Sequence, residues 1–379
     1  MIREVKKFCP VTVVLPEGSD AQLLGFLDKL DVPCEFLSHH SSIKPAPGLG
    51  QKIKMHVDKL RGEILLLRHL KKHDLSNSVV HIELAPWQSL LALIYLCRRS
   101  GQVFVTMHNR IRSDSGWRRA LWKFKLGVIS RYRNFHILAS NKDARESLRG
   151  LAPAKFVDDI RITYTSINPP EIDAVLDGEF DREAISRKFD LAEDKFTVIC
   201  VGQFIDRKGR WTFLEAAQKL DCSGEDIQFV WISNSKPDAQ DQEKIASYGL
   251  GDNFKLITND RIGDDRNDLL RMYRLGDVFV LASFIEGLPI ALLEAMALKV
   301  PSISTNVNGI PEAIKHLETG WLIEAGDSTA LAEAIAALKG DIELRNKLAT
   351  NGREIVLREF DEREAAKTAL KAYQQAFEH

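Results

Sequence analysis

The sequence predicts an α/β protein that consists of two doubly wound, Rossmann-like domains. Short apolar runs rich in β-branched residues alternate with helical patterns along the chain. These runs are continuously apolar, which is typical of parallel strands buried on both faces of a sheet. In addition, a chain of 379 residues is long for one hydrophobic core and suits two domains.

The candidate strands fall into two groups. In the first half they cover residues 11–15, 34–37, 79–83, 103–107, 136–140 and 162–166. In the second half they cover residues 196–202, 227–233, 254–258, 277–283, 301–305 and 321–324. Pro169 and Pro170 interrupt any helix between the groups, so we expect domains at 1–168 and 169–355. The pattern is wholly helical near the end, where residues 356–379 are expected to form a C-terminal helix.

The composition is that of a soluble globular protein, with 45% hydrophobic and 28% charged residues. No apolar run approaches the roughly 18 residues that a membrane span needs. The N-terminus lacks the pattern of a signal peptide. The five cysteines are scattered without a Cys-x-x-Cys pair, which favours reduced thiols over a disulfide framework or a zinc site. We therefore expect a cytoplasmic protein.

The net charge of −1 conceals a strong asymmetry between the two halves. Residues 1–170 hold 27 Lys and Arg against 15 Asp and Glu, a balance of +12. The remaining residues hold 25 against 38, a balance of −13. The basic half is therefore expected to face an anionic partner.

The stretch FIEGLPIALLEAMA, residues 284–297, predicts a binding site at a strand-to-helix turn. The strand before it ends near residue 283, and Pro289 suits the first turn of the helix after it. Unpaired backbone N–H groups at such a helix start attract a phosphate. Here these groups are those of Gly287, Leu288 and Ile290.

Glu286 and Glu294 flank this helix start. Beside a bound phosphate the two carboxylates suit sugar hydroxyls, because hydroxyls donate to carboxylates while the phosphate takes the N–H groups. A nucleotide-sugar meets both demands. The alternative is that Glu286 caps the helix and Glu294 is a solvated helix residue.

The stretch VGQFIDRKG, residues 201–209, has the pattern of a strand, a glycine turn and basic residues at a helix start. Arg207 and Lys208 are placed to neutralise a diphosphate at the facing loop. The alternative is a solvated basic turn.

Together these segments resemble the retaining GT-B glycosyltransferases, specifically glycosyltransferase family 4. The family pattern S-x-x-E-G-x-x-x-x-x-x-E-A-M-A reads SFIEGLPIALLEAMA here, and V-G-R-x-x-x-x-K-G reads VGQFIDRKG. The segment TNVNGIPEAIKHLETGWLIEAGD is similar to the family's G-G-I-P-E…G-x-L-V segment. The resemblance implies two facing Rossmann-like domains and a C-terminal helix that crosses back onto the first.

The resemblance also implies roles for individual residues. Glu286 would contact the donor sugar's hydroxyls, Glu294 would hold the ribose and Lys208 would bind the diphosphate, while Glu312 is expected to be structural. Glu286, His108 and Lys208 are the catalytic candidates. The donor-binding candidates are Glu294, Arg207, Gln203, Gly202, Gly287, Leu288, Pro289 and Ile290.

One position departs from the family pattern, because Gln203 stands where the family has arginine. Arg207 is a candidate to replace the lost charge. If nothing replaces it, the protein is a nucleotide-sugar-binding protein with weak or lost activity. A nucleotide-sugar epimerase on the same fold is a further alternative. No Asp-x-Asp or His-Glu-x-x-His occurs, so neither a catalytic metal nor another cofactor is expected.

The resemblance is looser in the first half. His108 follows a predicted strand and occupies a step where the family often has a histidine near the donor sugar and acceptor. Gly18, between Glu17 and Asp20, is a poor phosphate cradle and is assigned only to the acceptor side. His81 and Glu83 are expected to be structural.

Residues 110–133 predict a basic amphipathic helix with eight Lys and Arg and one acid. Trp117, Leu121, Phe124 and Val128 form one stripe on it. Such a helix can lie on an anionic membrane surface, or it can pack its stripe on the domain core. The membrane-surface candidates are Trp117, Arg118, Arg119, Lys123 and Lys125. A glycan or lipid-linked acceptor suits the basic half, and nothing resembles a nucleic-acid module.

Overall fold

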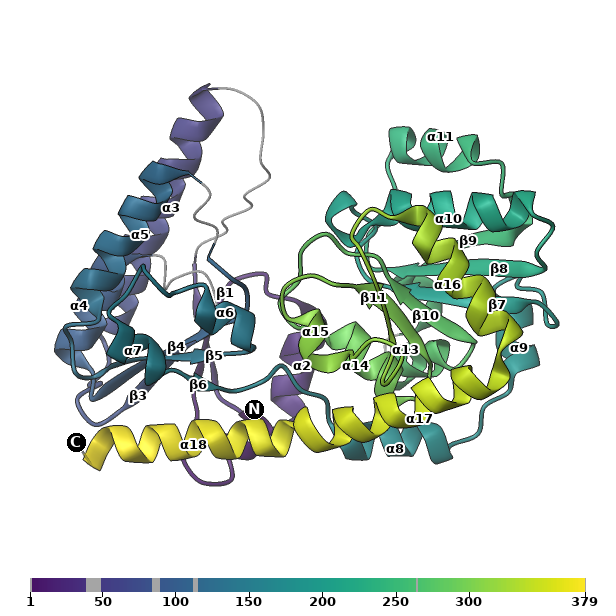
Figure 1. The fold of residues 1–379 in the computed structure, drawn as a ribbon. Coiled ribbons are helices and arrows are strands. Elements are labelled where there is room, and N and C mark those ends of the chain that lie inside the picture. Colours follow the sequence, from purple (N-terminus) through teal and green to yellow (C-terminus); the bar gives the residue numbers. More distant parts are fainter. Residues whose placement is uncertain (1, 39–48, 84–88, 112–114, 264, 379) are drawn as a thin grey trace. The chain divides into compact units, whose positions relative to one another are not determined.

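The computed structural model describes residues 2–38, 49–83, 89–111, 115–263 and 265–378, without the side chains of residues 22, 49–56 and 59 (Figure 1). The chain forms two compact units. The N-terminal unit consists of Met1–Ser140, Arg145–Thr163 and Ala366–His379. The C-terminal unit consists of Asn141–Ala144 and Tyr164–Ala365. The units thus divide near residues 163 and 365, whereas the sequence placed its boundaries at 168 and 355.

The N-terminal unit contains two parallel sheets in its described part. Strands β1 (Val13–Pro16) and β2 (Cys34–Leu37) form one pair. The other sheet has the order β3-β4-β5-β6 and consists of β3 (Val79–Ile82), β4 (Gln102–Met107), β5 (Phe135–Ala139) and β6 (Arg161–Ile162). All of these pairings are parallel, as predicted.

The first two strands differ from the expectation of burial on both faces. In β1 the side chains alternate between buried or half-buried and exposed, and in β2 only Phe36 is exposed. In contrast, β4 is buried over Val103–Met107. A run of apolar residues indicates a strand, but it does not show how many layers cover the sheet.

The helices of the N-terminal unit are α1 (Ile2–Val5), α2 (Ala21–Lys29), α3 (Leu49–Leu70), α4 (Leu90–Arg99), α5 (Gly116–Ile129), α6 (Lys142–Glu146, shared with the other unit) and α7 (Ala154–Asp158). The C-terminal helix α18 (Glu362–Glu378) begins in the C-terminal unit and continues into the N-terminal unit from Ala366. There Ala369 and Ala372 pack with Phe104 and Leu138 in a small apolar cluster. In addition, Gln102 Nε2 donates to the carbonyl of Ala376 over 2.7 Å.

The C-terminal unit is built on one six-stranded parallel sheet with the order β12-β11-β10-β7-β8-β9. Its strands are β7 (Phe196–Val201), β8 (Ile227–Ser233), β9 (Phe254–Thr258), β10 (Val278–Leu281), β11 (Ser302–Thr305) and β12 (Trp321–Ile323). Each lies within one residue or two of the predicted bounds. This order is that of the Rossmann fold, and the winding reverses between β7 and β10. The doubly wound prediction is therefore confirmed for this unit.

Helices surround this sheet in the C-terminal unit (Figure 1). They are α8 (Pro169–Asp177), α9 (Arg182–Lys188), α10 (Arg210–Cys222), α11 (Ala239–Ser247), α12 (Asn259–Ile262), α13 (Arg266–Tyr273), α14 (Ile290–Ala297), α15 (Ile310–Ala313), α16 (Ser328–Gly340) and α17 (Ile342–Glu359). One continuous core fills the unit, and Val280, Leu281 and Leu293 in it are fully buried. Within the described residues, no helix combines the length and apolar content needed to cross a membrane.

Candidate functional site

The two motif segments meet in the C-terminal unit at the point where the strand order reverses. Strands β7 and β10 are neighbours, with Val278 opposite Val198 and Phe279 opposite Ile199. The loops after these strands therefore start side by side, and the N–H of Phe284 donates to the carbonyl of Arg207 over 2.9 Å. Open α/β sheets bind ligands at this reversal point.

A glycine brings the first loop close to the second. Asp206–Lys208 form a 3₁₀ turn, rather than the start of a helix as the sequence suggested, and Gly209 follows it with φ of 73°. A Cβ at Gly209 would lie 1.8 Å from the carbonyl oxygen of Ala282. Only glycine permits both this left-handed conformation and this close approach. The turn thereby directs Lys208 toward the loop after β10.

Glu286 is buried, with 5% of its surface exposed, and it is surrounded by polar partners. Its Oε1 lies 2.6 Å from Nζ of Lys208 and accepts a hydrogen bond from Ser283 Oγ over 2.7 Å. Its Oε2 lies 3.5 Å from the guanidinium of Arg207, which also donates to the carbonyl of Ile285 over 3.0 Å. A buried carboxylate needs such partners to remain charged. The structure therefore brings Glu286, Lys208 and Arg207 together.

The start of helix α14 supplies backbone donors beside this cluster. Pro289 occupies the N-cap position, and no side chain caps the helix there. The N–H of Glu286 donates to Asn308 Oδ1 over 3.2 Å. Among the described residues, no acceptor is found for the N–H groups of three positions, Gly287, Leu288 and Ile290. Unpaired N–H groups at a helix start carry partial positive charge and can bind an anion.

Glu294 lies one turn inside α14 and is 2% exposed. It accepts a hydrogen bond from Tyr273 on Oε2 over 2.8 Å and pairs with Arg266 through Oε1. Burial and the neighbouring Glu294 hold the pKa of Tyr273 well above its ordinary value, so the phenol stays a donor. Burial acts to lower the pKa of Arg266, but Glu294 and Glu171 outweigh it, and the pKa is raised. A carboxylate has further lone pairs, so Glu294 can still accept from a ligand hydroxyl.

The position that departs from the family pattern lies in the loop after β7, five residues before Lys208. The side chain of Gln203 is exposed and makes no hydrogen bond within the described part of the chain. The carbonyl of Gly202 accepts a hydrogen bond from the indole of Trp231 over 2.9 Å. Arg207 is thus the arginine that the structure places beside Glu286.

In the N-terminal unit, His108 follows the end of β4 and is half-exposed, with Nε2 2.9 Å from Oε2 of Glu83. Burial acts to raise the pKa of Glu83, but His108, His81 and Thr106 together lower it. His81 contacts Thr106 through Nε2 over 2.6 Å and Tyr373 of α18 through Nδ1. Gly18 lies in the exposed turn after β1 with φ of 75°.

Helix α5 shows two different apolar stripes. Leu126 and Ile129 are buried, and Trp122 beside them is half-buried. The stripe identified in the sequence is largely outside the core, because Trp117, Leu121 and Phe124 are exposed by 65%, 43% and 62%. Val128 is half-buried. The alternative in which this stripe packs on the core is therefore wrong for its first three residues.

Basic side chains lie beside the exposed stripe of α5. Arg118 lies over the ring of Trp117 in this stripe at 5.4 Å, whereas Lys125 lies over the half-buried Trp122 of the other stripe at 5.2 Å. Arg119 and Lys123 are exposed. Residues 112–114, which belong to the predicted basic segment, lie outside the described residues.

Sequence reasoning missed several partners of the two acids. Ser283 and Asn308 contact Glu286, while Arg266 and Tyr273 hold Glu294. One local signal was present, because Arg266 begins helix α13, where a cation opposes the helix dipole. Such a cation suggests a partner elsewhere, but it does not identify Glu294. Glu312, expected to be structural, accepts hydrogen bonds from the N–H groups of Lys142 and Asp143.

The fold is the GT-B fold of glycosyltransferases. A solved structure of Anabaena Alr3699/HepE in complex with UDP aligns with 96% of this chain and all of its own chain, with a TM-score of 0.72 and 13% identity. In the sequence comparison, residues 181–355 match the family model described as "Glycosyl transferases group 1".

Two curated relatives each match less than half of the chain. The amylovoran biosynthesis glycosyltransferase AmsK of Erwinia amylovora is 31% identical over 155 residues, which are 39% of this chain and 37% of AmsK. The capsular polysaccharide biosynthesis glycosyltransferase CapM of Staphylococcus aureus is 28% identical over 183 residues, 48% of this chain and 47% of CapM. The matched part of the chain thus covers less than half of the length of each of these two relatives.

Proposed function

We propose that this protein is a retaining hexosyltransferase. It transfers a sugar from a nucleoside-diphosphate sugar to a glycan or lipid-linked acceptor in polysaccharide or glycolipid biosynthesis. The observation that carries the proposal is the arrangement in the C-terminal unit, where Lys208 and Arg207 converge with the start of α14 on the buried Glu286. The fold also supports it, since HepE was solved with UDP. The match to CapM favours a role in polysaccharide synthesis.

The donor diphosphate is assigned to the cations and the helix start. Lys208, Arg207 and the N–H groups of Gly287, Leu288 and Ile290 all present positive charge at the reversal point of the sheet. As the bond from the sugar to the diphosphate breaks, negative charge grows on the leaving phosphate. Donors fixed before the reaction stabilise this charge without reorganising. We assign the main part of the rate enhancement to them.

The two buried acids are assigned to the hydroxyl groups on either side of the diphosphate. Glu286 accepts from the donor sugar, and Glu294 accepts from the ribose. Arg266 and Tyr273 hold Glu294 in place. Glu286 is held by Ser283 and Lys208, and we assign it to positioning the sugar rather than to nucleophilic attack. In this scheme the acceptor oxygen bonds to the anomeric carbon from the same face that the diphosphate leaves, so the configuration is retained. The leaving phosphate accepts the acceptor's proton, so no separate base is needed.

The acceptor side is assigned to the N-terminal unit. His108, which is paired with Glu83 at 2.9 Å, is assigned to contact with the donor sugar or acceptor, and Gly18 is assigned to the acceptor side. The exposed aromatic and basic residues of α5 suit an anionic membrane surface, where a lipid-linked acceptor would lie. We propose peripheral attachment to the inner face of the membrane through this helix.

The test is turnover of the full chain with a panel of UDP- and GDP-sugars and a membrane extract as the source of acceptor. We expect nucleotide release that requires the acceptor. A product inverted at C2 without acceptor would identify an epimerase. Tight nucleotide binding without turnover under any condition would identify a binding protein, as the exposed Gln203 permits.

The Glu286→Gln variant tests whether turnover depends on this site. Glutamine keeps the shape of the side chain but loses the negative charge that strengthens hydrogen bonds from sugar hydroxyls. We expect turnover to fall by about 10²-fold or more. Glu333→Gln is the matched control, since Glu333 is exposed on α16 of the same unit. Equal turnover of the two variants would remove Glu286 from the mechanism.

A further inference from the structure

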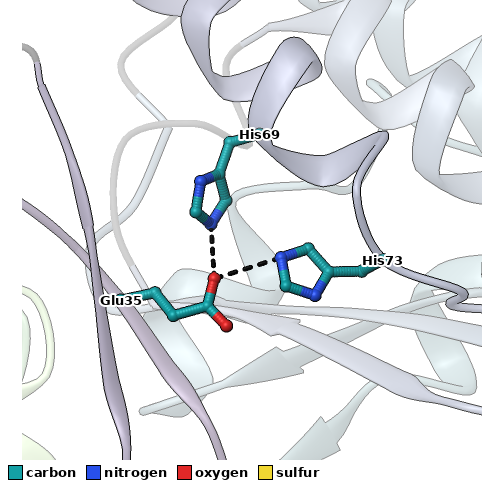
Figure 2. A group of neighbouring side chains, drawn as sticks. All are labelled: Glu35, His69 and His73. Carbon is teal, nitrogen blue, oxygen red and sulfur yellow. Dashed lines mark ion pairs between the residues drawn. The ribbon is translucent and has the colours of Figure 1, made fainter.

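Three metal-binding side chains converge in the N-terminal unit, in residues that the proposed function does not use. They are Glu35 of β2, His69 in the last turn of α3 and His73 in the turn that follows it (Figure 2). Oε2 of Glu35 lies 2.8 Å from Nε2 of His69 and 3.1 Å from Nε2 of His73. Figure 2 shows both imidazole rings directing Nε2 toward this one carboxylate oxygen.

We propose that Glu35, His69 and His73 bind a zinc-type divalent transition-metal ion. Two imidazoles and one carboxylate are a ligand set that Zn²⁺ uses, with a fourth position left for water. His69 lies in the last turn of α3 and His73 in the turn that follows the helix, and both approach the same carboxylate oxygen, which suits a shared ion. The ligand atoms lie within 4.8 Å of one another. In a tetrahedral site with zinc–ligand bonds of about 2.0–2.1 Å, the ligand atoms lie about 3.3 Å apart. Rotations of the three side chains would bring their ligand atoms to this spacing.

A bound metal ion accounts for the arrangement of these three side chains better than a hydrogen-bonded cluster does. Nε2 of His69 is buried and lacks a well-directed hydrogen bond to any described residue, although Oε2 of Glu35 lies 2.8 Å away. Buried polar atoms in native proteins are nearly always satisfied, and an ion is one of the ways to satisfy them. A metal placed beside both atoms would use the lone pair of the imidazole nitrogen instead of an N–H.

The surroundings of the cluster also favour a cation. The carboxylate of Glu35 supplies a negative charge, and the three side chains are partly buried. The site lies at the C-terminal end of α3, where the helix dipole is negative. Lys71 and Lys72 come from the same segment, but both are exposed, so water screens their charge.

The ion would join two elements that are far apart in the sequence. Strand β2 belongs to a two-stranded sheet with a small apolar cluster around Leu15, Leu27 and Val32. A small cluster contributes little burial energy, and an ion that binds only the folded state stabilises it by mass action. The inferred role is therefore structural. It does not depend on the proposed transfer reaction.

The test uses the full, tag-free chain after treatment with a chelator, titrated with ZnCl₂ by calorimetry and by equilibrium dialysis with metal analysis. We expect one Zn²⁺ per chain with a micromolar or lower Kd, and a higher Tm with Zn²⁺ than with EDTA. MgCl₂ should produce neither effect, because Mg²⁺ prefers oxygen ligands. Co²⁺ in place of Zn²⁺ should show the visible absorption of a four-coordinate ion.

Variants locate the bound ion. His69→Gln, His73→Gln and Glu35→Gln should each weaken Zn²⁺ binding at least tenfold and remove the Tm increase. Glu63→Gln, on the same helix, and Cys9→Ser, which removes an exposed thiol, should bind as the parent does. Should His69→Gln fail to fold, the half-exposed His73 still provides the test. No binding up to 1 mM ZnCl₂, or unchanged affinity in the His73→Gln variant, would overturn the proposal.

Discussion

The ammonium group of Lys208 lies 2.6 Å from Oε1 of Glu286, and both side chains are largely buried. The two residues are 78 positions apart and meet because β7 and β10 are neighbours in the sheet. A charge pair in this environment is stable only while both partners are present. It therefore couples the stability of the C-terminal unit to the proposed donor site.

Removing one partner of this pair is expected to destabilise the protein. Lys208→Met leaves the buried carboxylate of Glu286 with the hydrogen bond from Ser283 and with the more distant Arg207 as its remaining cation, and we expect a loss of about 2–3 kcal/mol. The double variant Lys208→Met/Glu286→Gln should be more stable than Lys208→Met alone, because it leaves no unpaired charge. Urea unfolding followed by circular dichroism measures both. If the stability loss of the double variant equals the sum of the losses of Lys208→Met and Glu286→Gln, the interaction between the two residues contributes nothing to folding.

Gly209 is expected to be indispensable for the shape of the donor loop. In Gly209→Ala the new methyl group would lie 1.8 Å from the carbonyl oxygen of Ala282, so we expect a loss of more than about 2 kcal/mol and weaker UDP binding. Gly224→Ala is the control, since Gly224 has a similar φ of 75° but no atom within 4 Å of the added Cβ. The control should lose only about 1–2 kcal/mol. Similar losses in both variants would show that the close approach to Ala282 is unimportant.

Restoring the family's arginine is expected to strengthen donor binding. Gln203→Arg adds a cation at an exposed position in the loop that carries Lys208, and a charge-assisted hydrogen bond to the diphosphate should lower the Kd for UDP about tenfold. Titration calorimetry at two salt concentrations measures the change, and added salt should reduce the gain. Gln240→Arg, on exposed α11, should leave the Kd unchanged. If Gln203→Arg and Gln240→Arg lower the Kd for UDP equally, the stronger binding is a general effect of the added positive charge.

The basic residues of α5 are expected to bind anionic vesicles. Replacing Arg118, Arg119, Lys123 and Lys125 with serine should weaken partitioning about a hundredfold or more, at about 1 kcal/mol for each charge near the surface. Sedimentation with phosphatidylserine-containing vesicles measures it. Phosphatidylcholine vesicles are the control and should bind the parent weakly. Unchanged sedimentation of the variant would leave α5 as ordinary surface.

The stability of the N-terminal unit is expected to depend on pH through His81. Burial lowers the pKa of His81 below its ordinary value of 6.5, so the folded state binds fewer protons than the unfolded state. Stability is therefore fully present above pH 6.5 and declines as the pH falls from there through the folded pKa. Thermal unfolding between pH 5 and pH 8 should show a weaker dependence in His81→Phe than in the parent. Burial also lowers the pKa of His136, which accounts for a remaining slope. An identical dependence in both proteins would contradict the assignment.

The sequence by itself determined the strands and parallel winding of the C-terminal unit and the loops that hold Glu286 and Lys208. These features follow from local patterns, because a buried parallel strand is apolar along its whole length and a helix start needs particular residues. The FKLIT and IQFVWIS runs, for example, coincide with β9 and β8 residue for residue. In the N-terminal unit, the strand predicted at 162–166 is wrong for most of its length, because β6 spans only Arg161–Ile162.

Only the tertiary structure decided which charges meet and which faces are covered. Arg266 reaches Glu294, His108 reaches Glu83, and Glu35 reaches His69 and His73, although no local pattern links these partners. Likewise, α5 buries Leu126 and Ile129 and exposes Trp117, although both stripes are equally apolar in the sequence. Pairing and burial depend on which distant segments the fold places together, and a local pattern of residues carries no information about that placement.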